Sequence, residues 1–345
     1  MYSLTPAGLV QSLRAPLSVI ECELLVVPWF EGEEPSSVPG LDAASGGEVA
    51  RALASREFSG KPFECFGATI GDRGWRARRL LLVGAGPAAD CGAEMLRKVA
   101  AAAGLSVRAR RVERAAFALR GSGDDIERAQ AAAEGLVLAQ FNVGGYKTGD
   151  VPAPLLPAWT VVAGDGTDES RLRSAVERGR LLGECSNLAK GLANEPGNTL
   201  TPREFAARAS AIAADGGAAV EVLDEHQIER LGMGLLLGVG RGSSEPPRLM
   251  VFRHEPPGAP AGPVLGLVGK GITFDTGGIS IKHADGMERM KSDMSGGAAV
   301  AAAMRAIARL GAPIRVVGIV PAAENMPGGR AIRPGDILTS ASGKT

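Results

Sequence analysis

Three of the chain's eight lysines fall within 22 positions, at Lys270, Lys282 and Lys291. The other 30 basic residues are arginines, so the sequence uses arginine wherever only a positive charge is needed. An amine can lose its proton and donate a lone pair, whereas a guanidinium cannot. We therefore expect lysines in this segment to act through an exchangeable proton or a free lone pair.

The same segment supplies two carboxylates, Asp275 and Asp293, which are hard oxygen ligands for a divalent cation. A neighbouring lysine amine could complete the shell of one ion, although removing its proton at pH 7 costs roughly 4.6 kcal/mol from a pKa of about 10.4. A bound dication can supply that free energy. A second lysine that keeps its proton would polarise a carbonyl and stabilise the oxyanion formed when metal-activated water attacks. Lysines and aspartates in a glycine-rich loop are most often simply solvated, so composition alone leaves that alternative open.

Glycines flank Lys270 on both sides, and the pair Gly277 and Gly278 follows Asp275 closely. The backbone after a strand expected over 264–268 can therefore bend and approach a ligand. Open α/β sheets bind ligands at the carboxyl ends of their strands. We expect the functional site at that edge of a sheet.

Apolar runs alternate with helical patterns along the chain, which indicates an α/β fold. The Pro-, Gly- and Asp-rich segment 150–168 predicts a boundary between a smaller N-terminal α/β domain, 1–165, and a C-terminal α/β/α domain, 166–345. We expect the second domain to contain a mostly parallel mixed sheet with both faces covered. Strands are expected over 17–28, 79–83, 219–223, 248–253, 264–268 and 314–320, and helices over 93–103, 125–138, 169–192, 202–214, 225–231 and 296–310.

Charge and cysteine usage narrow the class of protein. The 38 basic and 38 acidic residues balance, and no basic stripe is present, so we expect neither a nucleic-acid nor a membrane partner. Residues 1–20 lack a basic start and a cleavage site, and the four cysteines are isolated, so we expect a cytoplasmic protein. With only three histidines, any metal must be held mainly by carboxylates.

The order of residues carries a more specific signal than their composition. The stretch 268–293 is similar, nearly residue for residue, to the signature region of the leucyl aminopeptidase family, the cytosolic two-metal exopeptidases. The similarity extends through 192–202, 240–243 and 321–336. It implies a metal-dependent aminopeptidase that releases N-terminal leucine or other apolar residues from peptides, with two Mn²⁺ or Zn²⁺ ions per complete subunit. The resemblance also implies a homohexamer with an N-terminal domain that serves assembly.

The resemblance assigns roles to five residues. It implies that Lys270, Asp275 and Asp293 ligate metal, with Asp275 bridging the two ions. It makes Lys282 the catalytic lysine that polarises the substrate carbonyl. Met290 matches a methionine that lines the pocket for the N-terminal side chain, although a methionine at this spacing is equally consistent with core packing.

The chain departs from the family pattern in small and large ways. Thr276, His283 and Asp285 stand where the family more often has serine, proline and an uncharged residue. The family's Asn-Thr-Asp-Ala-Glu-Gly-Arg motif, which carries its remaining ligands and a catalytic arginine, does not occur, and the acids after Asp293 match positions that the family does not use as ligands. Two aspartates and a lysine are too few for two dications. We therefore expect a C-terminally incomplete catalytic domain, part of a longer polypeptide, with little activity of its own.

Two alternatives remain. The pattern Gly84-x-Gly86-x-x-Ala89 follows a strand and precedes a helix, as a dinucleotide-binding fingerprint would, which would favour an oxidoreductase. It lacks an acid about 20 residues further on at the end of a second strand. The other alternative is a non-catalytic family subunit, which the presence of all four lysine and aspartate positions argues against.

Overall fold

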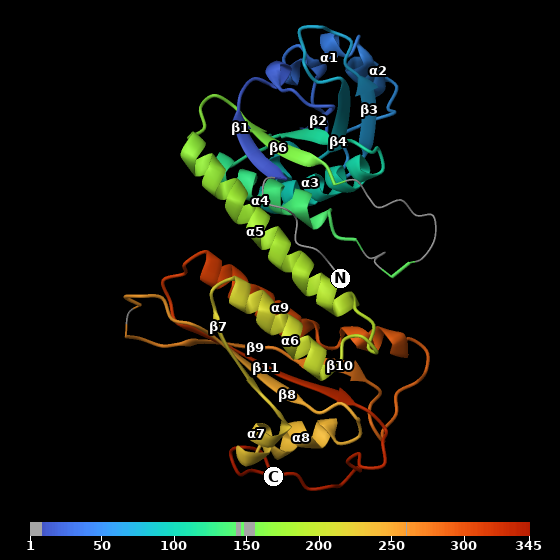
Figure 1. The fold of residues 1–345 in the computed structure, drawn as a ribbon. Helices are drawn as coiled ribbons and strands as arrows, with labels where there is room; N and C mark the ends of the chain where they lie inside the picture. The colour runs from blue at the N-terminus through green and yellow to red at the C-terminus, as the bar shows by residue number, and fades with distance from the viewer. Residues whose placement is uncertain (1–8, 143–145, 148–155, 260) are drawn as a thin grey trace. The chain divides into compact units, whose positions relative to one another are not determined.

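The computed structural model describes residues 9–142, 146–147, 156–259 and 261–345 (Figure 1). The described residues form two compact units, one up to Glu184 and the other Cys185–Thr345. This division falls inside the long helix α5 (Glu169–Asn194), whereas the sequence placed a boundary at 165/166. Part of the expected linker, 150–155, lies outside the described residues. Among the described residues, no helix combines the length and apolarity needed to cross a bilayer.

The first unit is a six-stranded sheet with helices on both faces. The strand order is β1-β6-β5-β2-β4-β3, and only the edge strand β3 runs antiparallel. The strands are β1 (Val10–Arg14), β2 (Leu24–Trp29), β3 (Cys65–Thr69), β4 (Arg79–Gly84), β5 (Arg114–Ala118) and β6 (Ala158–Ala163). The helices are α1 (Leu41–Ala44), α2 (Glu48–Ala54), α3 (Ala93–Arg108), α4 (Asp125–Leu138) and the start of α5.

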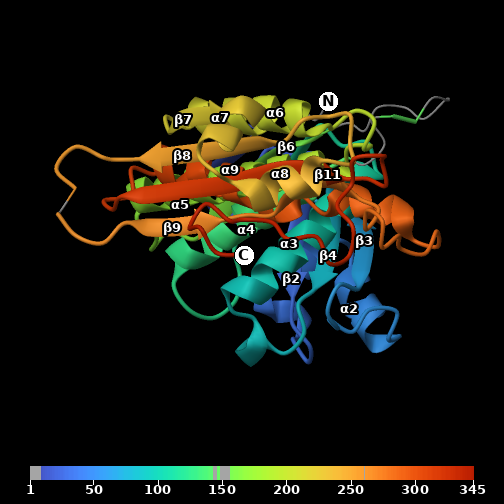
Figure 2. The same cartoon turned by 90° about the horizontal axis from the view of Figure 1, so that it is seen from below.

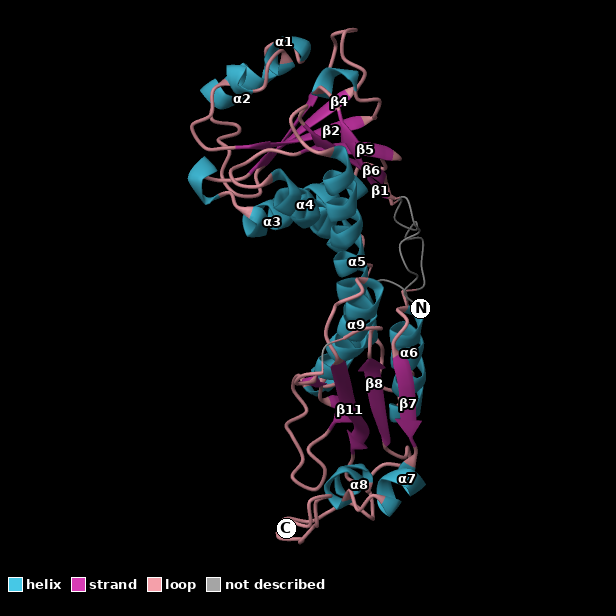
Figure 3. Ribbon diagram, turned by 90° about the vertical axis from the view of Figure 1, so that its left-hand side faces the viewer, coloured by secondary structure: helices cyan, strands magenta, loops and turns pink. Residues whose placement is uncertain are grey.

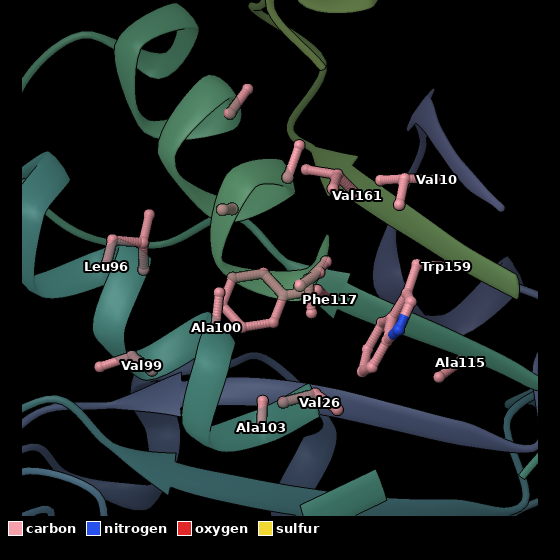
Figure 4. Close-up of a cluster of buried hydrophobic side chains, with 14 of the residues drawn as sticks. Val10, Val26, Leu96, Val99, Ala100, Ala103, Ala115, Phe117, Trp159 and Val161 are labelled. Atoms are coloured by element: carbon pink, nitrogen blue, oxygen red, sulfur yellow. The ribbon is translucent and has the colours of Figure 1, made fainter. Parts of the chain in front are cut away.

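Successive side chains of β2 point to opposite faces of the sheet, so this strand contributes to the hydrophobic cores on both faces. Val26 packs with α3 and α4, whereas Leu25 and Val27 belong to the cluster beneath α1 and α2. Figure 4 shows the first of these clusters, in which Phe117 and Trp159 contribute the large aromatic surfaces. Both faces of the central strands β2 and β4 are buried, as a largely parallel sheet requires.

The second unit contains a five-stranded mixed sheet of order β10-β11-β8-β7, with β9 also pairing with β11. Its strands are β7 (Ala219–Leu223), β8 (Arg248–His254), β9 (Leu265–Val268), β10 (Gly271–Asp275) and β11 (Val316–Asn325). Its helices are α6 (Pro202–Asp215), α7 (Glu225–Arg230), α8 (Gly234–Gly240), the 3-10 helix η4 (Met287–Ser292) and α9 (Ser295–Arg309). Both β9 and β10 run parallel to β11, while β8 and β7 follow as antiparallel neighbours. Figure 2 shows β8, β11 and β9 side by side.

One face of this second sheet packs against α6 and α9 through a core that includes Met250, Phe252 and Val320. The other face is covered only in part, by α7 and α8, which lie at one end of β7, β8 and β11 in Figure 3. Val268 and Ile319 are register partners on that face, with exposed fractions of 75% and 38%. In the described part of this sheet, the face opposite α6 and α9 is thus only partly covered.

Two strand predictions also needed correction. The expected strand 17–28 begins only at Leu24, because Leu17–Val19 forms a 3-10 turn after Pro16. The strand expected to stop at Val320 runs to Asn325, since Pro321 fits the extended backbone and the following residues pair with β10. Together, these corrections leave the two-domain α/β architecture as predicted.

Helix starts follow the capping chemistry of the sequence. The Thr201 hydroxyl accepts a hydrogen bond from the amide of Glu204, and Pro202 occupies the first position of α6. Asp224 and Gln227 form a capping box at the start of α7. These local bonds fix the ends of helices whose apolar faces then pack on the sheet.

Candidate metal and catalytic site

Lys270 lies at a break in a strand. The segments β9 and β10 pair in turn with β11, so they form one strand that is interrupted at Gly269 and Lys270. A Cβ atom at Gly269 would lie 2.5 Å from the carbonyl oxygen of Gly296, so only glycine allows the start of α9 to approach. The amide of Gly297 donates a hydrogen bond to the carbonyl of Lys270 at 2.7 Å. The glycines thus place Lys270 against the start of α9.

Asp275 is the last residue of β10, and the loop after it folds back on the strand. Gly277 and Gly278 adopt φ angles of 90° and 65°, which strongly favour glycine. The Lys282 amide then donates to the Thr276 carbonyl at 2.8 Å and closes the loop. This return brings the side chain of Lys282 to the carboxylate of Asp275.

The four predicted polar residues form two lysine–aspartate pairs. Lys282 Nζ donates to Asp275 Oδ2 at 2.7 Å, and Lys270 Nζ lies 2.9 Å from Asp293 Oδ2. Met290, in η4, places its Sδ atom 3.1 Å from Lys282 Nζ. The structure therefore brings Met290 into contact with the lysine expected to act in catalysis.

The two aspartates are much less exposed than the two lysines. The exposed fractions are 14% for the side chain of Asp275 and 23% for Asp293, against 39% for Lys282 and 58% for Lys270. Burial acts to raise the pKa of Asp275, but hydrogen bonds from Lys282 and from the Gly277 amide outweigh it, so its pKa is lowered. Asp275 is consequently an anion across the physiological pH range.

Asp293 has a buried oxygen that suits a cation. Its Oδ2 atom accepts no hydrogen bond from the described residues, and its contact with Lys270 is an ion pair alone. A buried carboxylate oxygen without a donor is costly unless a positive charge lies beside it. No group of three or more histidine, cysteine, aspartate or glutamate residues is arranged to hold a metal within the described ranges. Within the described residues, the segment thus supplies the carboxylates of Asp275 and Asp293 and the amine of Lys270 as donors of the kind that a divalent cation takes.

The third lysine of the segment has a structural contact. Lys291 Nζ donates to the carbonyl of Asn194 at 2.8 Å, and Asn194 is the last residue of α5. A cation at a helix C-terminus satisfies a free carbonyl and interacts favourably with the helix dipole. His283 and Asp285, the two departures in the loop, have exposed side chains.

The residue that sequence reasoning missed is Asn325. Its Nδ2 atom donates to Asp275 Oδ1 at 2.8 Å. Glu324, beside it on β11, accepts a hydrogen bond from the Ser243 hydroxyl at 2.7 Å instead, and burial raises its pKa. The signal available in the sequence was the stretch 321–336, in which both residues lie.

The glycines of the proposed dinucleotide fingerprint have a packing role. A Cβ atom at Gly84 would overlap the carbonyl oxygen of Lys61, so glycine is required there by close backbone packing. A 3-10 turn, Ala88–Asp90, separates this segment from α3. The helix therefore does not start at the glycines, as phosphate binding by this motif requires.

Comparison with known proteins gives a consistent result for both units. Residues 187–345 match the catalytic domain of the cytosol aminopeptidase family, and residues 26–150 match the N-terminal domain of that family. A probable cytosol aminopeptidase from Solibacter usitatus is 46% identical over 333 residues, which cover 96% of this chain and 66% of the relative. A second, from Acidobacterium capsulatum, is 40% identical and covers 96% of this chain and 68% of the relative.

Solved structures agree with the sequence relatives. The bottromycin maturation enzyme BotP in complex with Mn is 35% identical with a TM-score of 0.75, covering 93% of this chain and 64% of that one. A mutant of tomato leucine aminopeptidase is 27% identical with a TM-score of 0.82, covering 97% of this chain and 66% of that one. The chain spans about two thirds of the length of the curated relatives it matches.

Proposed function

The chain belongs to the cytosol aminopeptidase family, and from this premise we propose that the protein is a metal-dependent aminopeptidase. It removes N-terminal residues, preferably leucine or other apolar ones, from peptides. The observation that carries the proposal is the pairing of Lys282 with Asp275 and of Lys270 with Asp293 within one glycine-framed segment. The Mn in the BotP structure and the buried Asp293 oxygen support a divalent ion, Mn²⁺ or Zn²⁺.

The metal would be held by Asp275, Asp293 and the amine of Lys270. When bound, a divalent ion lowers the pKa of water and polarises carbonyl oxygens. Both aspartates contact a lysine in this structure, so Lys270 would coordinate through its neutral amine while Lys282 would remain beside Asp275. These ligands are too few for two ions, so we propose that residues 1–345 hold at most one with useful affinity.

Lys282 is proposed to stay protonated and to bind the carbonyl oxygen of the scissile bond. Its ammonium group has three donors, of which one points to Asp275 and another faces the Met290 sulfur. The third donor would face the carbonyl oxygen of the substrate and stabilise the negative charge that develops on it. Met290, whose thioether is apolar and adaptable, would line the pocket for the N-terminal side chain.

The remaining features of the protein are proposed from the family. We place it in the cytoplasm, expect it to assemble as a homohexamer, and assign the first unit to assembly. The balanced charge of the chain, with 38 basic and 38 acidic residues, supports peptides as partners.

The experiment is hydrolysis of leucine amide and leucyl p-nitroanilide by the full-length polypeptide, with Mn²⁺ or Zn²⁺, before and after chelation. We expect activity to disappear with the metal and to return on its addition. Activity that survived complete metal removal would contradict the proposal.

A further inference from the structure

Asn325 and Asp275 are register partners at the ends of two parallel strands. In the β10–β11 pair the two residues lie opposite each other, and the side chains meet at 2.8 Å, from Asn325 Nδ2 to Asp275 Oδ1. The backbone hydrogen bonds of this parallel pair fix the positions of both Cα atoms, and so the distance between the two side chains. The contact is therefore a consequence of the sheet and not of a mobile loop.

The same Asp275 oxygen has a second donor. The backbone amide of Gly277 donates to Oδ1 at 2.9 Å. A carboxylate oxygen has two lone-pair sites, so two donors saturate Oδ1. The other oxygen, Oδ2, accepts from Lys282 alone among the described residues.

From this geometry we infer that Asn325 is a positioning residue for the metal site, which holds the Asp275 carboxylate so that Oδ2, beside Lys282, would be available to a metal ion. The inference rests on the proposed function, because it concerns the metal that this function requires. A hydrogen bond to a metal ligand from a residue that does not itself bind the metal restricts the ligand to one orientation. Loss of such a bond typically weakens metal binding by about 10–100-fold.

The Asn325 side chain is itself held in one orientation. Its backbone carbonyl accepts from both the amide and the hydroxyl of Thr276, at 2.9 and 2.8 Å. A Cβ atom at Gly278 would lie 2.7 Å from Asn325 Oδ1, so glycine leaves the space that the amide group occupies. Rotating the amide by half a turn would bring two oxygens together, so the hydrogen-bond network sets which atom donates.

The test is Mn²⁺ binding to the full-length polypeptide, measured by calorimetry and by the paramagnetic resonance spectrum of the bound ion. We expect Asn325→Ala to bind Mn²⁺ about 10–100-fold more weakly than the wild type and to give an altered spectrum. Asn325→Leu keeps a side chain that branches at Cγ but has no amide donor, and it should show the same loss, which keeps the test valid if the alanine variant folds poorly.

Ser243→Ala is the matched control. It removes a hydrogen bond to Glu324, the neighbour of Asn325 on β11, without touching Asp275. We expect its Mn²⁺ affinity to match that of the wild type. Equal weakening in Ser243→Ala would overturn the inference, because the effect would then belong to the strand as a whole.

Two other outcomes separate the inference from the proposed function. If the wild type binds Mn²⁺ but both Asn325 variants bind it equally well, the positioning role is wrong while the proposed function stands. If the wild type itself binds no Mn²⁺ or Zn²⁺ and shows no metal-dependent hydrolysis, the proposed function fails first.

Discussion

Replacing Lys282 by alanine should separate catalysis from metal binding and from stability. The Lys282–Asp275 pair is partly exposed at the lysine, so its net contribution to folding is on the order of 0.2–1 kcal/mol. Asp275 keeps the hydrogen bonds from Gly277 and Asn325 in the variant, so no buried carboxylate loses all its donors. We expect only a small decrease in thermal stability.

The effect on turnover should be far larger. An ammonium that contacts the developing oxyanion acts mainly in the transition state, and removing one such donor typically lowers kcat by about 10²–10³, or roughly 2.7–4 kcal/mol. Metal content should not fall, because Lys282 is not itself a proposed ligand and Asp275 keeps its hydrogen bonds from Gly277 and Asn325. KM should change much less than kcat.

The assay is steady-state hydrolysis of leucyl p-nitroanilide by the full-length polypeptide, with metal content determined on the same samples. Lys291→Ala is the matched control, since Lys291 caps the carbonyl of Asn194 and has no contact with Asp275 in the structure. It should lose stability, on the order of 1.5–3 kcal/mol for a charged hydrogen bond, and keep its turnover. Loss of metal in proportion to turnover in Lys282→Ala would refute the assigned role, as would an equal fall in kcat in Lys291→Ala.

Three further results are expected. Residues 1–345, purified alone, should retain at most one weakly bound ion and hydrolyse peptides poorly; metal analysis showing two tight ions together with hydrolysis would mean that the ligand set is wrong. Burial raises the folded-state pKa of Glu324 above its usual value near 4.5, so the neutral carboxyl favours the folded state at low pH and this contribution is lost as the pH rises. The variant Glu324→Gln should therefore have a higher melting temperature than the wild type at pH 7 but not near pH 4. An equal increase at both pH values would show that the charge of Glu324 is not the cause. Gly269→Ala should lower the free energy of unfolding by about 1–3 kcal/mol, measured by denaturant unfolding, because the new Cβ atom meets the backbone of Gly296. Gly266→Ala is the control and should lower it much less, since no atom lies within 4 Å of a Cβ at that position. Similar losses in the two variants would exclude the close approach to Gly296 as the cause.

Local sequence signals predicted much of the fold because the chemistry they report is local. The N-cap of α6 and the span of α4 depend on residues within one or two turns, and both were found as predicted. The predicted strand 79–83 was found as β4, with each residue from Leu80 onward buried. Here the hydrophobic pattern and the tertiary structure agree.

What the sequence could not reveal depends on contacts between distant segments. A proline at 321 normally argues against a continuing strand, yet β11 continues because β10 offers it a parallel partner. The apolar, glycine-rich α8 was missed because glycine disfavours a helix, whereas tertiary packing requires glycine at Gly234, where a Cβ atom would lie 2.5 Å from the carbonyl oxygen of Thr339. The four site residues were predicted through family resemblance, but their arrangement in two pairs depends on the loop after β10 and on the approach of α9 to Lys270, and the contact of Asn325 with Asp275 depends on the β10–β11 register.

The pairing of β10 with β11 makes the site a product of folding as a whole. Asp275 and Asn325 are 50 positions apart, and α9 lies between them in the chain, so closing this loop costs entropy before any contact forms. An unfolded chain consequently has no such site, and an ion that binds only the folded form stabilises it by mass action, by about 1.4 kcal/mol for each tenfold rise in free ion above Kd. The metal would thus stabilise the folded protein as well as take part in catalysis. The concentration of the ion in the cell would then affect both the fraction of the protein that is folded and its rate of turnover.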